Sequence, residues 1–379
     1  MKQSKRAILT THTGSLPRPP EMLARLADGA TDIDRHNVYD TQAREAVAQA
    51  VKRQAGLGIS IVNDGEQSKP SYATYVKDRL TGFDGTTQSR DPARIDVAEF
   101  PGFHSHTSIQ AVHRPTCSGP ISWKDWEAVE RDIAHFKAAL NQINVEEAFM
   151  TAASPGVIAR FLHNEYFPSE EAYLYAVAEV MKDEYEAIAA AGLVLQVDCP
   201  DLASSRSDIF AHLSLEEFRK VVVLHLEVLD YALSRIPPEQ VRLHLCWGNY
   251  EGPHHRDIPL KDIIDLVLRA RPAGISFPGA NSRHEHEWKV WGEISVPDGK
   301  IIIPGVIDTT TNFIEHPEVV AQRIARYADM VGREKVIAST DCGLSTFAGG
   351  SRVDPDIAWH KLGSLVEGAR LATEELWPR

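Results

Sequence analysis

Short apolar stretches alternate along this chain with polar turns and longer amphipathic segments. Eight apolar stretches have the length expected of buried strands, and they lie at residues 7–11, 59–63, 147–151, 193–197, 241–246, 273–277, 301–306 and 335–339. Segments with helical spacing lie between most of them, for example at residues 41–55, 169–190, 214–235, 260–269 and 317–331. Strands that alternate with helices are typical of a parallel sheet wrapped by helices.

Eight strand–helix pairs favour a closed barrel over an open sheet. The pattern therefore predicts one domain over residues 1–379, a single (β/α)₈ barrel of the TIM type. Residues 68–126 interrupt the alternation, because they contain the turn signal Asp84-Gly85 and a stretch rich in proline and glycine at 115–120. We interpret them as an insertion after the second strand, either a β-hairpin or a small subdomain.

Composition and charge narrow the class of protein. The chain has 379 residues, 43% of them hydrophobic, and a formal net charge of −13, which fits a cytoplasmic enzyme. The negative charge argues against nucleic acid or an anionic membrane as a partner, because it repels phosphate. No stretch approaches the roughly 20 apolar residues that span a bilayer. The four cysteines favour metal binding or catalysis over a disulfide framework.

His244 and Cys246 stand two positions apart at the end of a predicted strand. Alternate residues of a strand point to the same side, so the two side chains share one face. Cys342 comes just after the last predicted strand, and the carboxyl ends of all barrel strands meet at one mouth. Two thiolates and one imidazole suit Zn²⁺. The spacing alone leaves open that both cysteines are buried packing residues.

Motifs at the predicted strand ends extend this pattern over nearly the whole chain. They are TTHTGSLPRP (10–19), VNDGE (62–66), TAASPG (151–156), LQVD (195–198), HLC (244–246), IPGVID (303–308) and TDCG (340–343). Together they resemble the C-terminal catalytic barrel of the cobalamin-independent methionine synthase family. They resemble more closely its short single-barrel relatives, which include epoxyalkane:coenzyme M transferase.

The resemblance implies roles for the matching residues. In that family a zinc ion is held by the positions that match His244, Cys246 and Cys342. The positions of Glu66 and Asp198 bind the ammonium group of homocysteine, and that of Ser15 contacts the substrate carboxylate. An alternative for Asp198 is that it caps the helix that follows its strand.

The metal site departs from the family pattern at one position. Pro278 stands where the family usually supplies a glutamate ligand, and proline cannot bind a metal. Glu285 or Glu287 would then have to reach the ion from the following loop. Otherwise a water molecule or the substrate takes the fourth position.

The proton-transfer residues depart from the pattern as well. The family's synthases carry a histidine beside the position of Asp308, which helps to move a proton during methyl release, and residues 308–312 of this chain, Asp-Thr-Thr-Thr-Asn, lack it. We expect Asp308 and His12 to be catalytic, with His316 as an alternative to His12 for the missing histidine.

Two further groups of residues allow two interpretations each. Four loop histidines form either a second metal site or, as we favour, a polar rim: His254, His255, His284 and His286. Four aromatic residues either line a pocket for a flat donor or belong to the core: Trp123, Phe161, Trp247 and Tyr250.

These features predict a zinc-dependent methyltransferase in methionine biosynthesis. A small-molecule thiol, homocysteine, would receive a methyl group from a small-molecule donor to give methionine. The main alternative is a zinc-dependent alkyl or epoxide:thiol transferase. A lyase or decarboxylase on the same barrel is a third class, and a non-catalytic zinc protein would need four ligands rather than three. Assembly as a homo-oligomer is left open.

Overall fold

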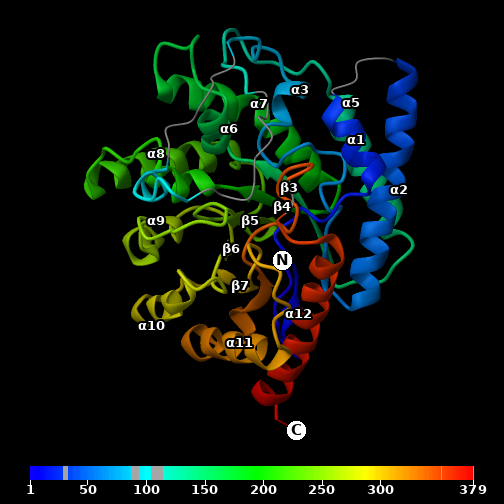
Figure 1. Cartoon of the computed structure of the whole chain (residues 1–379), viewed down its shortest axis with the longest axis vertical. Helices are drawn as coiled ribbons and strands as arrows, with labels where there is room; N and C mark the ends of the chain where they lie inside the picture. The colour runs from blue at the N-terminus through cyan, green and yellow to red at the C-terminus, as the bar shows by residue number, and fades with distance from the viewer. Residues whose placement is uncertain (29–32, 87–93, 104–113, 351, 379) are drawn as a thin grey trace.

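Eight parallel strands form the centre of the described structure. The computed structural model describes residues 1–28, 33–86, 94–103, 114–350 and 352–378. Its strands are β1 (Leu9–Thr10), β2 (Ile61–Val62), β3 (Glu147–Ala153), β4 (Val194–Asp198), β5 (Val241–His244), β6 (Gly274–Phe277), β7 (Ile301–Ile307) and β8 (Ile337–Thr340). They pair in the order β1-β8-β7-β6-β5-β4-β3-β2 and form a nearly closed barrel (Figure 1), so the predicted barrel fold is confirmed.

β1 and β2 meet where the barrel closes, and hydroxyl groups replace the backbone ladder there. The Thr10 N–H donates to Ser60 Oγ at 3.2 Å, and the Ser60 N–H donates to Thr10 Oγ1 at 3.1 Å. Thr11 Oγ1 donates to the Ile61 carbonyl at 3.1 Å. Because side chains satisfy these backbone groups, β1 and β2 are shorter than the stretches predicted for them.

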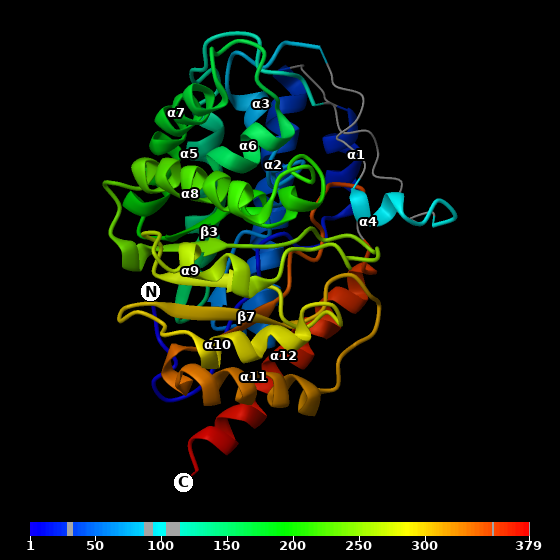
Figure 2. The same cartoon turned by 90° about the vertical axis from the view of Figure 1, so that its left-hand side faces the viewer.

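Helices cover the outside of the barrel (Figures 1 and 2). Within the described residues they are α1 (Pro20–Asp28), α2 (Ile33–Leu57), α3 (Val76–Arg79), α4 (Ile95–Ala98), α5 (Glu127–Leu140), α6 (Pro155–Phe161), α7 (Glu170–Ala190), α8 (Leu215–Ala232), α9 (Ile264–Val267), α10 (Val290–Glu293), α11 (Pro317–Val331) and α12 (Pro355–Leu376). Four of the five predicted segments overlap α2, α7, α8 and α11. The fifth, residues 260–269, is divided, because the backbone leaves the helical region at Ile263, where φ is −133°.

The segment predicted as an insertion, residues 68–126, contains α3 and α4. An antiparallel bridge joins Leu80 to Trp123, so the two ends of the segment lie beside each other. Residues 87–93 and 104–113 lie outside the described residues. The extent of the insertion therefore stays a prediction.

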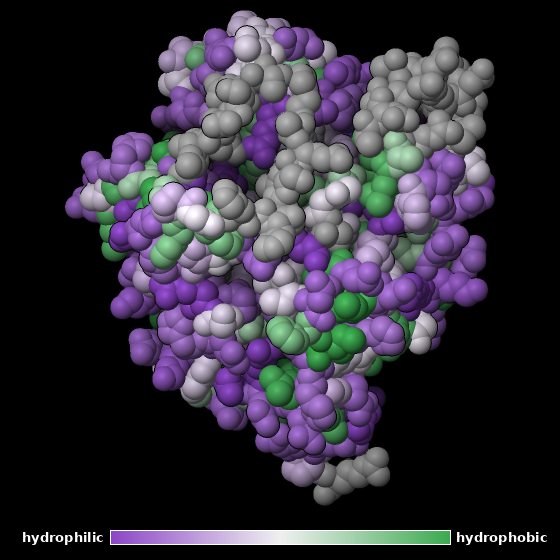
Figure 3. All heavy atoms as spheres, viewed as in Figure 1, coloured by the Kyte–Doolittle hydropathy of each residue, from purple (hydrophilic) through white to green (hydrophobic). Residues whose placement is uncertain are grey.

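Apolar side chains fill the amino end of the barrel. A cluster of them comes from the first residues of several strands and includes Ile61, Val194, Ile301 and Ile337. This packing leaves the carboxyl end of the barrel for polar and reactive side chains. The outer face seen in Figure 3 is mainly hydrophilic. No helix among the described residues is both long enough and apolar enough to cross a bilayer.

Gly305 offers a test of the packing around β7 and β8. A Cβ at this position would lie 2.2 Å from Asp341 Oδ1 and 2.6 Å from Asp341 Cα. Gly305→Ala should lower the free energy of unfolding by about 1–3 kcal/mol, the usual cost of overpacking, as measured by urea denaturation. Gly363→Ala in α12 is the control, because the added Cβ would meet no atom within 4 Å other than the adjacent residues and backbone of its own helix. It should raise stability by about 0.5–1 kcal/mol, and equal effects of the two changes would contradict the crowding.

Candidate metal centre

His244, Cys246 and Cys342 come together at the carboxyl end of the barrel. Their ligand atoms all lie within 4.8 Å of one another, and all three residues are buried. β5 ends at His244, and Cys246 follows two positions later. β8 ends at Thr340, and Cys342 follows it in the same way. The structure thus assembles the three predicted ligands from two strands that are far apart in the sequence.

Neighbouring groups orient these side chains. His244 Nδ1 lies 3.1 Å from Ser276 Oγ on β6, which leaves Nε2 for a metal ion. The hydrogen bond from Cys342 lowers the pKa of the Cys246 thiol well below its usual value, and His244 contributes to the shift. The same contact raises the pKa of Cys342. Cys246 is therefore the thiol of the pair that ionises first.

Asp341 holds the loop after β6 against the site. Its carboxylate accepts three backbone N–H groups at 2.8 Å each, those of Gly279, Ala280 and Asn281. This loop begins with Pro278, which lines a cavity together with Cys342. Burial raises the pKa of Asp341 to about 6, and Asp308 adds to the increase.

The two glutamates considered as fourth ligands point to other partners. Glu285 Oε1 lies 3.2 Å from Arg323 Nε. Glu287 accepts the Leu260 N–H at 2.7 Å. Neither joins the group of potential ligands around His244 within the described residues. Three protein ligands leave room for a substrate atom at a zinc ion.

Glu66 and Asp198 form a buried acidic pair beside this centre. Glu66 Oε1 accepts a hydrogen bond from Thr151 at 3.1 Å, whereas its Oε2 is buried without a hydrogen bond to any described residue. Asp198 Oδ1 accepts from Gln196 at 2.7 Å. Burial raises the pKa of both carboxyl groups, and Glu66 raises that of Asp198 further. A bound cation would favour the ionised carboxylates, so the pair suits an ammonium group.

Arg18 is a structural element of the site that the sequence analysis did not single out. Its guanidinium donates to the backbone carbonyls of Glu66 and Ser345, at 2.8 Å each. The loops after β1, β2 and β8 are thereby joined. Ser15 lies in the first of these loops, against Gly343, where an added Cβ would be 2.0 Å from Ser15 Oγ. In the sequence, Arg18 is marked as a site residue only by its place in the first motif, residues 10–19.

Asp308 and His12, the residues predicted to move protons, are both hydrogen-bonded to neighbouring side chains. The two carboxylate oxygens of Asp308 accept from the N–H and hydroxyl groups of Thr310 and Thr311, at 2.6–3.2 Å. His12 Nε2 lies 2.8 Å from Gln54 Oε1, and burial lowers its pKa to about 4. His12 is therefore neutral at pH 7. The catalytic roles of Asp308 and His12 stay predictions.

His316, the alternative to His12, caps a helix. Its Nδ1 accepts the Glu318 N–H at 3.2 Å at the start of α11.

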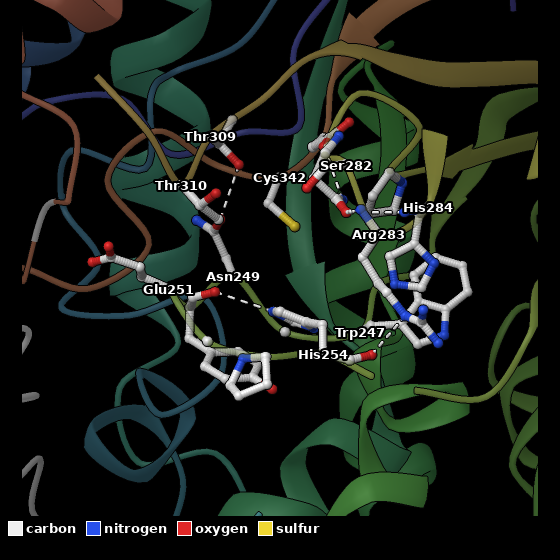
Figure 4. A pocket seen from close by; sticks show the side chains of 17 residues that line it. Trp247, Asn249, Glu251, His254, Ser282, Arg283, His284, Thr309, Thr310 and Cys342 are labelled. Carbon is white, nitrogen blue, oxygen red and sulfur yellow. Dashed lines mark hydrogen bonds between the residues drawn. The ribbon is translucent and has the colours of Figure 1, made fainter. Parts of the chain in front are cut away.

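A cavity of about 150 Å³ opens on Cys342 (Figure 4). Trp247 and Tyr250 line it, whereas Trp123 and Phe161 do not. The cavity is also lined by residues of the loops after β5, β6 and β7, among them His254, His284 and Thr309. It therefore leaves space next to the sulfur atom of Cys342.

His284 lines this cavity and lies between two carboxylates. Its Nδ1 lies 2.9 Å from Glu287 Oε2, and its Nε2 lies 3.1 Å from Asp257 Oδ2. Burial disfavours the imidazolium form, but these two carboxylates outweigh it and raise the pKa of His284 to about 9. The imidazole ring stacks on Trp247 with ring centres 4.0 Å apart.

Comparisons with known proteins identify relatives over almost the whole chain. The family model described as "Cobalamin-independent synthase, Catalytic domain" matches residues 8–355. A methionine synthase from Sulfolobus acidocaldarius is 24% identical over 375 residues, which are 97% of this chain and 93% of that protein. A methionine synthase from Sulfurisphaera tokodaii is 23% identical, with the same coverage of the two chains.

A solved structure shares the fold. The B12-independent methionine synthase from Shewanella sp. W3-18-1, in complex with selenomethionine, matches with a TM-score of 0.75 and 20% identity. The match covers 98% of this chain and 99% of that chain.

The ion pairs of His284 predict a pH dependence of stability in metal-free protein. The folded-state pKa of about 9 lies above the ordinary value of 6.5. The contribution of these ion pairs to the free energy of unfolding is therefore complete below pH 6.5 and is lost as the pH rises through 9. It amounts to roughly 3 kcal/mol at most. Urea denaturation with a chelator should show this loss for the native chain and a flatter curve for His284→Gln. Parallel curves for the two proteins would contradict the assignment.

Proposed function

The chain belongs to the cobalamin-independent synthase catalytic-domain family, and we propose that it is a zinc-dependent methyltransferase that converts homocysteine to methionine. The observation that carries this proposal is the convergence of His244, Cys246 and Cys342, with ligand atoms within 4.8 Å, at the mouth of the barrel. The name methionine synthase of the relatives that cover 97% of the chain supports the same reaction.

The three side chains fit a zinc ion by their chemistry. Two sulfur atoms and an imidazole nitrogen are soft donors, and Ser276 fixes the imidazole through its other nitrogen. Zinc bound to them would supply the thiolate form of the substrate at neutral pH, where a free thiol is mostly protonated. Arg18 and Asp341 keep the surrounding loops in place.

Glu66, Asp198 and Ser15 orient the homocysteine in this proposal. The unpaired Oε2 of Glu66 and the carboxylate of Asp198 receive the ammonium group. Ser15, packed against Gly343, faces the carboxylate from the first loop. Three fixed contacts on the amino-acid part leave the sulfur atom little freedom, which lowers the entropic cost of reaching an in-line geometry.

The cavity that opens on Cys342 holds the methyl donor. Trp247 and Tyr250 offer aromatic surface, and Asn249 and Thr309 are tied together by a 2.9 Å hydrogen bond in its wall. In the reaction a bond forms between sulfur and the methyl carbon, and the bond from that carbon to the leaving atom breaks. The leaving atom keeps the electron pair of that bond and takes up a proton, which balances the proton that the thiol loses when it ionises.

A second candidate is transfer of the thiol to an epoxide. Two departures from the family pattern favour it over a folate-type donor, because Pro278 stands where the family has a glutamate ligand and residues 308–312 lack the family histidine. The same sulfur nucleophile would open the ring, and the ring oxygen would take up the proton. The acidic pair Glu66 and Asp198 supports homocysteine as the thiol. Burial outweighs the nearby Lys69 and raises the pKa of both carboxyl groups, so an ammonium group of the substrate would add the charge that favours the ionised pair.

The cysteines provide the first test of the zinc site. Cys246→Ser and Cys342→Ser should each lose the zinc of this centre and lower the rate of methionine formation by at least about 100-fold, because the thiol substrate is no longer ionised. Zinc content by mass spectrometry and methionine by chromatography measure both effects. Cys117→Ser is the matched control, since Cys117 Sγ only donates to the Gly119 carbonyl. Full activity of both site variants would disprove the proposal.

The acidic pair provides a test of the substrate. Glu66→Gln should raise KM for homocysteine by roughly 10-fold or more, because one charge-assisted contact with the ammonium group is lost. It should leave KM for coenzyme M, which has no amine, nearly unchanged. Steady-state kinetics with both thiols measure these KM values for the native enzyme and the variant. A native enzyme that prefers coenzyme M would favour the epoxide transferase instead.

A further inference from the structure

A second group of potential metal ligands lies on the wall of the cavity that opens on Cys342. One ligand atom each from His254, Asp257 and His284 lies within 4.8 Å of the other two. His254 and His284 both line the cavity (Figure 4). Asp257 is buried behind them.

The hydrogen bonds of the two histidines have the pattern of metal ligands. His254 directs Nδ1 to Asp257 Oδ2 at 2.5 Å and gives Nε2 to the Tyr250 carbonyl at 3.1 Å. His284 directs Nε2 to the same Asp257 oxygen at 3.1 Å and gives Nδ1 to Glu287 at 2.9 Å. Histidines that bind a metal usually donate the other ring N–H to a carbonyl or a carboxylate, which fixes the ring. The Tyr250 carbonyl and the Glu287 carboxylate provide such partners for the two histidines here.

Asp257 is held in the same manner. Its Oδ1 accepts from Arg94 at 3.0 Å and from Ser207 at 3.2 Å. Its Oδ2 is turned to the two imidazole rings. Three ligand atoms therefore converge on one place, and each ligand residue is fixed from behind by a separate contact.

The backbone at His254 is a second, independent indication. Among the described residues, only Glu66 and His254 are non-glycine residues with positive φ, at 53° each. Such conformations are unfavourable for most side chains and concentrate at functional sites. The other residue with positive φ, Glu66, carries the buried oxygen that the proposed function assigns to the substrate ammonium group.

We propose that His254, Asp257 and His284 bind a second divalent metal ion, separate from the ion of the cysteine centre. Two imidazoles and one carboxylate are harder ligands than the cysteines and suit zinc, manganese or iron. Three protein ligands leave coordination positions open towards the cavity. An ion held there would supply a Lewis acid for the leaving atom of the methyl or alkyl donor, because its ligands line the same cavity as Cys342.

This proposal concerns only two of the four histidines expected from the sequence to form a polar rim. His255 lies 2.8 Å from Glu99 at the surface, and His286 is exposed, so both fit a rim. His254 and His284 instead share a buried carboxylate. His255 therefore serves as a neighbouring control for the metal-binding test.

The test is equilibrium dialysis of the full chain against zinc, followed by metal analysis. The native protein should bind two ions per chain. Asp257→Asn and His284→Gln should bind one, Cys246→Ser should bind one, and His255→Gln should bind two. An unchanged far-ultraviolet circular dichroism spectrum, together with the one ion retained, shows that each variant is folded. A single ion in the native chain, or two ions in both Asp257→Asn and His284→Gln, would overturn the proposal.

Cobalt substitution separates this site from the cysteine centre. Cobalt bound by cysteine gives a strong sulfur-to-metal charge-transfer band, whereas cobalt bound by imidazole and carboxylate gives none. Asp257→Asn should retain the charge-transfer band and lose one equivalent of cobalt. Cys246→Ser should lose or weaken the band and retain one equivalent. Loss of the band in Asp257→Asn, with no change in stoichiometry, would contradict a separate second site.

Discussion

The parallel register of the barrel strands determines where the His244 imidazole lies and brings together the loops that carry the rest of the site. His244 of β5 pairs with Ser276 of β6, so the pairing that builds the sheet also brings the serine hydroxyl to the imidazole ring. Cys342 reaches the same place because β1 and β2 close the barrel and all carboxyl ends face one mouth. A shift of one residue in β5 would turn His244 to the other face of the sheet and remove the metal centre.

The fold and the convergence of His244, Cys246 and Cys342 could be predicted because both depend on short, regular spacing. A two-residue period places His244 and Cys246 on one side, and the barrel topology brings in Cys342. The contacts of Glu285 and Arg18 could not be predicted, since they join loops with no periodic pattern. The same holds for His254, His284 and the carboxylate between them, because only the folded loops bring them together.

Two groups of titratable residues flank the proposed reaction site. The acidic pair Glu66 and Asp198 lies on the side proposed for the amino-acid part of the thiol. His284 lies between Asp257 and Glu287 on the wall of the cavity that opens on Cys342. In the proposed reaction the acidic pair would hold the ammonium group of the thiol, and the cavity wall would face the leaving atom. At the amino end of the barrel, the buried guanidinium of Arg242 lies 3.4 Å over the Phe149 ring of the apolar cluster.

The central claim is that the cysteine centre binds a metal ion that contacts the substrate sulfur. The most direct test is X-ray absorption at the selenium edge with selenohomocysteine bound to the zinc-loaded chain. The account predicts a zinc neighbour of selenium at slightly more than the roughly 2.3 Å of a zinc–sulfur bond. The zinc neighbour should disappear in Cys246→Ser. A spectrum with carbon neighbours alone in the native protein would contradict the account.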